Sequence, residues 1–188
     1  MIPATPEKEK ALIDALRAGR PDAKKTLYEL FYRYLAAVCA RYLPDGDEVD
    51  DLVQDVFIKI FDRFGSFEHR GTGSLQAWCR RVAVNEALQL LRARKKMNTV
   101  PLEAVGDLPE PDDSPGVATI PEAELLAMVR RLPDRYRTVF NLYVFEKMSH
   151  REIAGMLHIR ENSSSVNLHR AKQLLTRWIG DYQKRRES

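Results

Sequence analysis

Residues 149–175 read SHREIAGMLHIRENSSSVNLHRAKQLL, and this stretch decides the fold class. Ser149 and Glu152 have the spacing of a capping box, which predicts a short helix that begins there and ends at Leu157. A turn follows, and a longer basic helix is predicted over about residues 163–182. One hydrophobic seam can join the two helices through Ile153, Leu157, Ile159, Leu168, Ala171 and Leu175. This pattern indicates a helix-turn-helix.

The outer face of the second helix carries short polar side chains near its start and basic ones further along. Short polar donors can read base edges in a major groove, and cations can hold phosphates. The candidate duplex-reading residues are Ser163, Ser164, Ser165, Asn167, His169, Arg170 and Lys172. An ordinary helical hairpin with a solvated charged face is the alternative that spacing alone leaves open.

Most of the remaining chain also reads as helix. Apolar residues at helical spacing predict helices over residues 7–18, 22–43, about 47–64, 74–96 and 134–145. Asp47 or Asp50 is expected to cap the third of these. No alternating run is long enough to indicate a sheet, so the predicted fold class is all-α.

The middle of the chain has a different composition. Residues 98–121 hold five of the ten prolines, and residues 97–129 hold seven acidic side chains without a Lys or Arg. Such a segment buries too little apolar surface to offset its ordering entropy, which predicts an extended acidic linker. The predicted organisation is one helical domain over residues 1–97, the linker over 98–121, and the helix-turn-helix domain over 122–188.

Both predicted domains carry more basic than acidic side chains. Residues 1–96 hold 17 basic and 14 acidic side chains, and residues 130–188 hold 13 basic and six acidic. Two basic lobes with an acidic tether are typical of a nucleic-acid binder, although a solvated charged surface gives the same pattern.

The helix predicted over residues 74–96 combines aromatic, basic and amide side chains on one stripe. At 100° per residue, the stripe consists of Trp78, Arg81, Asn85, Gln89, Arg92 and Lys96. An aromatic ring can stack on a base and cations can hold phosphates, which is typical of single-strand recognition. The alternatives are that a neighbouring loop covers Trp78 as a core residue and that the cations are only solvated.

Several classes of function are excluded or disfavoured. The sequence contains no run of 18 apolar residues, so no membrane span is predicted. Its first residues lack the basic-then-apolar pattern of a secretory signal. No phosphate-binding loop, catalytic motif or metal-ligand cluster is present, so we expect no enzyme activity, no metal and no cofactor. Cys39 and Cys79 lie in apolar helical patterns and are expected to be buried free thiols of a cytoplasmic protein.

Three segments resemble one protein family. Residues 50–61, DDLVQDVFIKIF, are similar to the helix of bacterial sigma factors that binds RNA polymerase core. Residues 75–88, LQAWCRRVAVNEAL, resemble their promoter-melting helix, and residues 132–172 resemble their helix-turn-helix for the upstream promoter element. The order of these blocks and the lack of a middle domain match the extracytoplasmic-function (ECF) group of the sigma-70 family.

The resemblance implies a role for each segment. The polymerase contacts would come from Asp51, Leu52, Gln54, Asp55, Phe57, Ile58 and Lys59. In the family, the loop before the melting helix captures a flipped base, and flipping costs a few kcal/mol. Here that loop spans residues 64–74. The residues implied for the downstream element and for melting are Phe67, His69, Arg70, Trp78, Arg81, Asn85, Arg92 and Lys96. The implied partners are RNA polymerase core, promoter DNA as duplex and single strand, and an anti-sigma factor, without membrane insertion.

Two departures from the family pattern concern the recognition helix. Asn162, Ser163 and Ser164 stand where many relatives have a small residue, a threonine and a valine, and Ser164 is expected to bond back to the backbone. Ser165 and Asn167 occupy positions that are often basic, which should weaken nonspecific phosphate binding. A stand-alone helix-turn-helix regulator of duplex DNA and a helical protein–protein adaptor remain the alternative functions.

Overall fold

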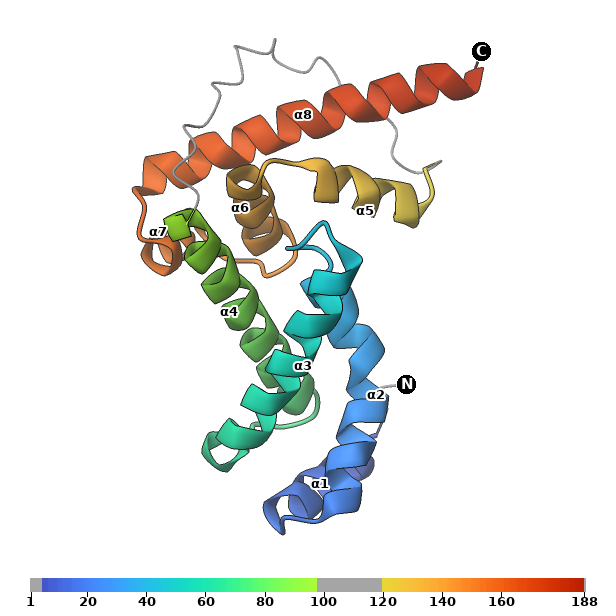
Figure 1. The fold of residues 1–188 in the computed structure, drawn as a ribbon, viewed down its shortest axis with the longest axis vertical. Helices are drawn as coiled ribbons and strands as arrows, with labels where there is room; N and C mark the ends of the chain where they lie inside the picture. The colour runs from blue at the N-terminus through green and yellow to red at the C-terminus, as the bar shows by residue number, and fades with distance from the viewer. Residues whose placement is uncertain (1–4, 98–119, 188) are drawn as a thin grey trace. The chain divides into compact units, whose positions relative to one another are not determined.

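The computed structural model describes residues 5–97 and 120–187, and every regular element in these ranges is helical (Figure 1). The chain divides into two compact units between Lys96 and Met97. The N-terminal unit contains α1 (Pro6–Arg17), α2 (Pro21–Cys39), α3 (Gly46–Arg63), the short 3-10 helix η1 (Phe64–Ser66) and α4 (Ser74–Met97). The C-terminal unit contains α5 (Glu122–Arg131), α6 (Asp134–Val144), α7 (His150–Leu157) and α8 (Glu161–Glu187).

The core of the N-terminal unit is built from helix faces with apolar residues three or four positions apart. This spacing places them on one side of each helix, where burial removes them from water. The fully buried residues include Leu27, Phe31 and Leu35 from α2, Val53, Val56 and Ile60 from α3, and Leu75, Cys79 and Ala83 from α4. Both cysteines are free and buried, as predicted.

Local capping sets the start of α3. Asp45, and not Asp47 or Asp50 as predicted, is the N-cap residue, and its side chain accepts a hydrogen bond of 3.0 Å from the Asp47 backbone N–H. An acidic cap satisfies a free N–H and interacts favourably with the helix dipole. The helix therefore begins at Gly46, earlier than a cap at Asp47 or Asp50 would place it.

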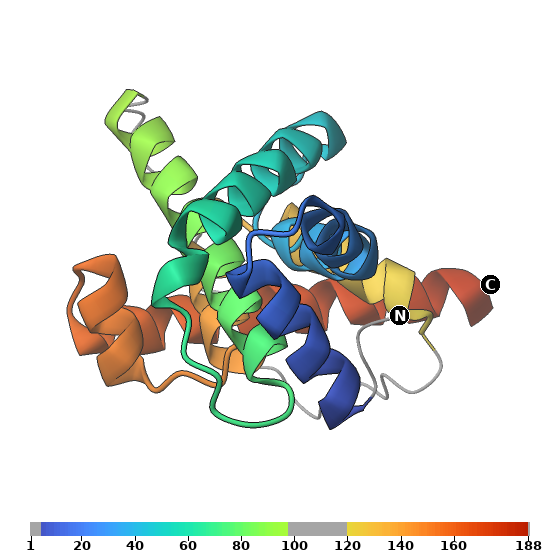
Figure 2. The same ribbon diagram turned by 90° about the horizontal axis from the view of Figure 1, so that it is seen from below.

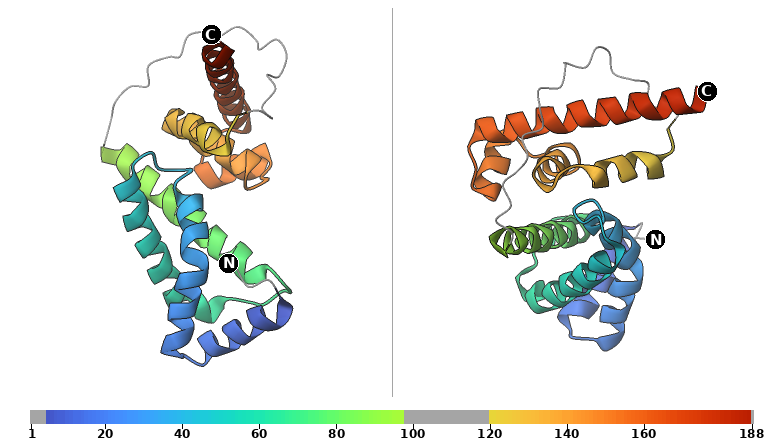
Figure 3. Two further views of the ribbon diagram at one scale, coloured as in Figure 1. Left: turned by 90° about the vertical axis from the view of Figure 1, so that its right-hand side faces the viewer. Right: turned by 45° about the horizontal axis from the view of Figure 1, so that its top comes forward.

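In the C-terminal unit, α8 is a single helix of 27 residues that packs against α5, α6 and α7 (Figure 3). Its inner face joins a hydrophobic cluster of Met128, Val129, Leu132, Tyr136, Ala171, Leu174 and Leu175. Trp178, Ile179 and Tyr182 extend this cluster towards the end of α8. The helix is longer at both ends than the predicted 163–182, and the added residues are polar or charged.

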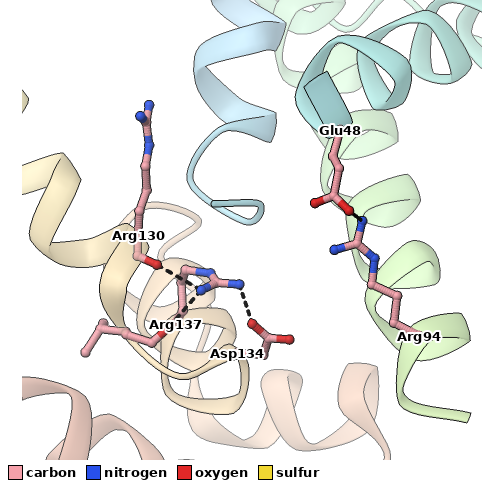
Figure 4. Close-up of polar contacts among 6 residues, drawn as sticks. Glu48, Arg94, Arg130, Asp134 and Arg137 are labelled. Carbon is pink, nitrogen blue, oxygen red and sulfur yellow. Dashed lines mark hydrogen bonds and ion pairs between the residues drawn. The ribbon is translucent and has the colours of Figure 1, made fainter. Parts of the chain in front are cut away.

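A buried arginine holds the turn between α5 and α6 (Figure 4). The guanidinium of Arg137 donates to the carbonyl oxygens of Arg130 at 3.0 Å and Leu132 at 2.8 Å, and to a carboxylate oxygen of Asp134 at 2.5 Å. These bonds satisfy carbonyls at the end of α5 that the helix leaves without an intrahelical partner.

The predicted fold class is confirmed, since the two units are helical and the C-terminal one contains a helix-turn-helix. The predicted linker spans residues 98–121. Of these, residues 98–119 lie outside the described ranges. None of the helices within those ranges is long and apolar enough to cross a membrane.

Candidate nucleic-acid and polymerase interface

The helix-turn-helix begins with the predicted capping box. The Ser149 N–H donates to a Glu152 carboxylate oxygen at 2.8 Å, and the Glu152 N–H donates to the Ser149 hydroxyl at 3.3 Å. Hydrogen bonds from the backbone and hydroxyl of Ser149 lower the pKa of Glu152. The box fixes the first turn of α7 and the direction in which the chain enters the motif.

The turn between α7 and α8 depends on a left-handed residue that sequence reasoning missed. His158 has φ 54° and ψ 47°, and its backbone N–H donates to the carbonyl oxygen of Ala154. Glycine is the usual residue at this C-terminal position, because a Cβ atom is strained there. The only signal in the sequence was the position of His158 directly after the last apolar residue of α7.

The outer face of α8 carries only part of the predicted set. Ser163, Ser165, His169 and Lys172 are exposed, and Arg170 is half-buried, with its Nη1 donating to Gln173 Oε1 at 3.3 Å. Asn167, expected to face outward, is buried, and so is Ser164. Ser164, Leu168, Ala171 and Leu175 have spacings of three and four, which places Ser164 on the inner face of the helix.

The buried Ser164 hydroxyl has a side-chain partner instead of the backbone partner expected from the sequence. Its Oγ lies 2.9 Å from Nδ1 of His150, the first residue of α7. The His150 ring stacks on Tyr143 with ring centroids 4.9 Å apart, and Lys172 Nζ lies 6.0 Å from the Tyr143 ring centroid. These contacts connect α6, α7 and α8 next to the exposed start of α8.

The predicted stripe on α4 is largely accessible. Arg81, Gln89 and Arg92 are exposed, whereas Trp78 and Asn85 are half-buried. Lys96 lies in α4, but its side chain is outside the part of the chain that the structure describes. The described cations and amides therefore present donors along one side of a long helix, as a nucleic-acid strand would require.

The loop before α4 begins in an aromatic cluster. Phe67 is only 4% exposed, and its ring centroid lies 5.6 Å from that of Phe64 and 5.3 Å from that of Trp78. The aromatic cluster thus buries Phe67, which is one of the three loop residues that the resemblance implies for base capture. His69 and Arg70 remain exposed, and Arg70 pairs with Glu68 at 2.9 Å.

Helix α1 holds both ends of this loop (Figure 2). The Glu9 carboxylate is buried and accepts hydrogen bonds from the backbone N–H groups of Gly73 at 2.6 Å and Leu75 at 2.9 Å. The Arg17 guanidinium donates to the carbonyl oxygen of Phe67 at 3.3 Å. Sequence reasoning missed both residues, although Glu9 shares the buried side of α1 with Leu12, Ile13 and Leu16, where an acidic residue needs a partner.

Helix α3 exposes only part of the set of residues predicted for polymerase contact. Asp51, Gln54, Asp55 and Ile58 are exposed and Lys59 is half-buried; Ile58 has the largest exposed fraction among the described large apolar side chains, 56%. Leu52 and Phe57 are each only 3% exposed. Their apolar side chains face the helix neighbours of α3, so they belong to the core and not to the exposed side.

An ion pair joins α3 to the far part of α4. Arg94 Nη2 lies 2.5 Å from Glu48 Oε1, and both side chains are partly shielded from solvent (Figure 4). This pair connects the first turn of α3 with α4 and so helps to fix the direction of the α4 stripe. Within residues 5–97 and 120–187, no group of His, Cys, Asp and Glu side chains has the arrangement of a metal site.

Comparisons with known proteins identify the family of both units. The family model described as sigma-70 region 2 matches residues 27–97, and the one described as sigma-70, region 4 matches residues 122–175. The chain therefore belongs to the sigma-70 family, and several of its relatives are named ECF sigma factors.

Two curated relatives have nearly the same length as this chain. It is 25% identical over 183 residues to the ECF RNA polymerase sigma factor SigW of Bacillus subtilis (strain 168). This alignment covers 92% of this chain and 97% of the relative. It is 25% identical over 178 residues to the ECF RNA polymerase sigma-E factor of Escherichia coli (strain K12), which covers 89% and 92%.

A solved structure has a similar fold. The sigma factor RpoE from Bartonella quintana, in a co-crystal structure with the anti-sigma factor NepR, matches with a TM-score of 0.50 and 22% identity. The match covers 81% of this chain and 94% of that chain.

Proposed function

We propose that this chain is a sigma factor that binds RNA polymerase core and directs it to promoters, where it takes part in DNA melting and transcription initiation. The observation that carries the proposal is the presence, in one chain and in the family order, of a basic and amide stripe on α4 and a helix-turn-helix in the C-terminal unit. A regulator that reads only duplex DNA does not need the first of these features.

The exposed side of α3 is proposed as the contact for polymerase. Asp51, Gln54 and Asp55 give it acidic and amide groups, and Ile58 adds an exposed apolar side chain. An acidic surface would be repelled by phosphates, so this side suits a protein partner better than DNA. Leu52 and Phe57 support it from the core.

The two DNA contacts are proposed to differ in kind. On α4, Arg81 and Arg92 would hold phosphates of a separated strand, with Asn85 and Trp78 next to them and His69 and Arg70 in the preceding loop. On α8, Ser163, Ser165, His169 and Lys172 would face a duplex major groove. Residues 1–97 would thus melt DNA, residues 122–188 would read duplex, and residues 98–121 would connect them.

The proposed partners also include an anti-sigma factor, a class of partner that the RpoE relative has in its co-crystal structure. The chain would act by binding alone, without chemistry of its own. We propose a cytoplasmic location, because RNA polymerase and its promoters are there.

The test combines core binding with transcription from a promoter library. The wild-type chain should co-purify with polymerase core and give transcripts from a subset of the library. Asp55→Arg should weaken core binding at least tenfold, because it reverses a charge at the centre of the exposed α3 side. Asp14→Arg makes the same charge change at an exposed position of α1 and should leave core binding unchanged.

Two outcomes would contradict the proposal. The wild-type chain could bind specific duplexes without core, which would favour the stand-alone regulator. Alternatively, Asp55→Arg could bind core normally and lose only promoter affinity, which would mean that α3 contacts DNA.

A further inference from the structure

Helix α1 lies before the segment that matches sigma-70 region 2, yet it makes the most buried polar contact of the loop that precedes α4. The match begins at residue 27, whereas Glu9 reaches a backbone 64 residues further along the chain. A carboxylate that is 3% exposed is costly to bury unless hydrogen bonds compensate for its lost hydration.

The Glu9 carboxylate acts as the N-terminal cap of α4 from another helix. Oε2 accepts from the Gly73 N–H and Oε1 from the Leu75 N–H, so both oxygens are used. These two N–H groups lie at the start of α4, where the helix supplies no acceptors and where its dipole favours a negative charge. Gly73 has φ +84°, a conformation that side chains other than glycine rarely adopt.

The remaining hydrogen bonds of the loop fix the backbone conformation of its middle residues. Arg17 holds the Phe67 carbonyl at the start of the loop. Within it, the Arg70 N–H donates to the Ser74 hydroxyl at 3.2 Å, and the Ser74 N–H donates to the Gly71 carbonyl at 3.1 Å. The exposed side chains of this path are those at residues 68–70 and Thr72.

We propose that Glu9 is a positioning residue for base capture: by holding Gly73 and Leu75, it keeps the loop over residues 68–72 in the one conformation that a single-stranded promoter base can enter. This inference rests on the proposed function, in which the loop contacts the unpaired downstream element. Arg17 has the same role at the other end of the loop. Neither residue touches the base.

The first measurement is amide hydrogen exchange of the full chain. Glu9→Gln keeps the size of the side chain but replaces one acceptor oxygen with an NH2 group, which cannot accept from an N–H. Exchange at Gly73 and Leu75 should become at least tenfold faster in Glu9→Gln. The matched control is Glu7→Gln, an exposed position on the same helix, which should leave both rates unchanged.

The second measurement is the base preference of each reconstituted holoenzyme on a single-stranded oligonucleotide library with a randomised downstream element. Glu9→Gln should reduce the wild-type preference at one position of the element at least fivefold, with less than a twofold change in affinity for polymerase core. A loss of general folding would instead weaken core binding as well. Arg17→Ala, at an exposed position, should reduce the same base preference. This variant provides the test if Glu9→Gln folds poorly.

Three results would overturn the positioning role. The exchange rates at Gly73 and Leu75 could equal those of the wild type, the base preference could survive despite faster exchange, or the loss could be equal at all positions. A wild-type holoenzyme without any base preference would contradict the proposed function instead, and the exchange rates would still decide whether Glu9 holds the loop.

Discussion

Arg137 is a buried charge that donates to backbone carbonyls as well as to a carboxylate. Its side chain is 3% exposed, and its guanidinium bonds the carbonyls of Arg130 and Leu132 as well as Asp134. An arginine suits this position because its planar group offers several donors in fixed directions. Its side chain connects both sides of the turn between α5 and α6, so its removal should be costly.

Arg137→Met should therefore lower the free energy of unfolding of the C-terminal unit by about 3 kcal/mol, because it leaves buried carbonyls without donors. Each unit contains one of the two tryptophans, Trp78 and Trp178. Urea unfolding followed by Trp178 fluorescence in a Trp78→Phe background measures this unit alone. Arg135→Met, at an exposed position two residues earlier in the same helix, should change the value by less than about 0.5 kcal/mol.

The two thiols are expected to be chemically inert in the folded chain. Burial raises the pKa of Cys39 and of Cys79 to about 12, and both side chains are inaccessible to solvent. A raised thiol pKa means less thiolate at a given pH, on the order of 1 in 100,000 at neutral pH, and the thiolate is the reactive form.

Iodoacetamide near neutral pH should consequently leave the native chain unmodified and add two groups after unfolding in guanidinium. Intact-mass measurement over time gives both results. Alkylation of the native chain at the rate of a free thiol would contradict the buried placement of the cysteines.

At the residue level, sequence could predict which chemical groups the candidate site contains but not which of them are exposed. Asp55, Arg81 and Lys172 are exposed polar residues on predicted helices. Phe67 and Asn167 are buried, because their environment is set by aromatic packing and by the inner face of α8. Side-chain type alone does not carry that information.

At the level of elements, the turn of the helix-turn-helix stores backbone strain at His158. A left-handed conformation costs a residue with a Cβ atom about 1–2 kcal/mol, and glycine avoids this cost. Glycine also raises the conformational entropy of the unfolded chain, which offsets part of the gain in stability. His158→Gly should thus raise the free energy of unfolding of the C-terminal unit by about 1 kcal/mol.

The comparison with His158→Ala separates strain from the loss of the imidazole. Both variants remove the ring, but only glycine relieves the strain, so alanine should give no gain. The measurement is again urea unfolding followed by Trp178 fluorescence. Equal stabilities of the two variants would mean that the backbone at residue 158 is not strained.

The helices themselves could be predicted because their signals are local: apolar spacing, the capping box at Ser149 and the breaks at Pro and Gly. The contacts between elements could not. The cap that Glu9 supplies to α4 joins residues 64 and 66 positions apart, and no periodicity within one helix predicts such a pair.

At the level of the whole molecule, the proposed division between melting and duplex reading can be tested with two cations. Arg81 on α4 and Lys172 on α8 are both exposed, and each should contribute about one unit to the salt dependence of promoter binding. Arg81→Ala should impair transcription on paired templates and recover when the downstream element is mismatched, because melting then no longer limits the reaction. Lys172→Ala should weaken upstream binding and gain nothing from the mismatch.

The measurement is abortive transcription on paired and pre-melted templates, with Arg63→Ala as the exposed control outside both contacts. Arg81 is a better choice than Trp78, since Trp78→Ala would also remove a packing partner of Phe64 and Phe67. Equal recovery of Arg81→Ala and Lys172→Ala would show that the two units do not divide the work.

In the proposed function, helix α8 reads DNA with its exposed face, and its other face packs in the hydrophobic core of its own unit. These two roles are geometrically coupled. Its 27 residues span about 40 Å without interruption, so it moves as a rod. A tilt of about 5° around Leu175 displaces Ser163, about 18 Å away, by about 1.6 Å. Substitutions at Leu174 or Leu175 that tilt α8 can therefore move the residues near Ser163 by more than half the length of a hydrogen bond. The promoter preference of such a protein can change through its apolar interior, without any exchange of the side chains that meet the bases.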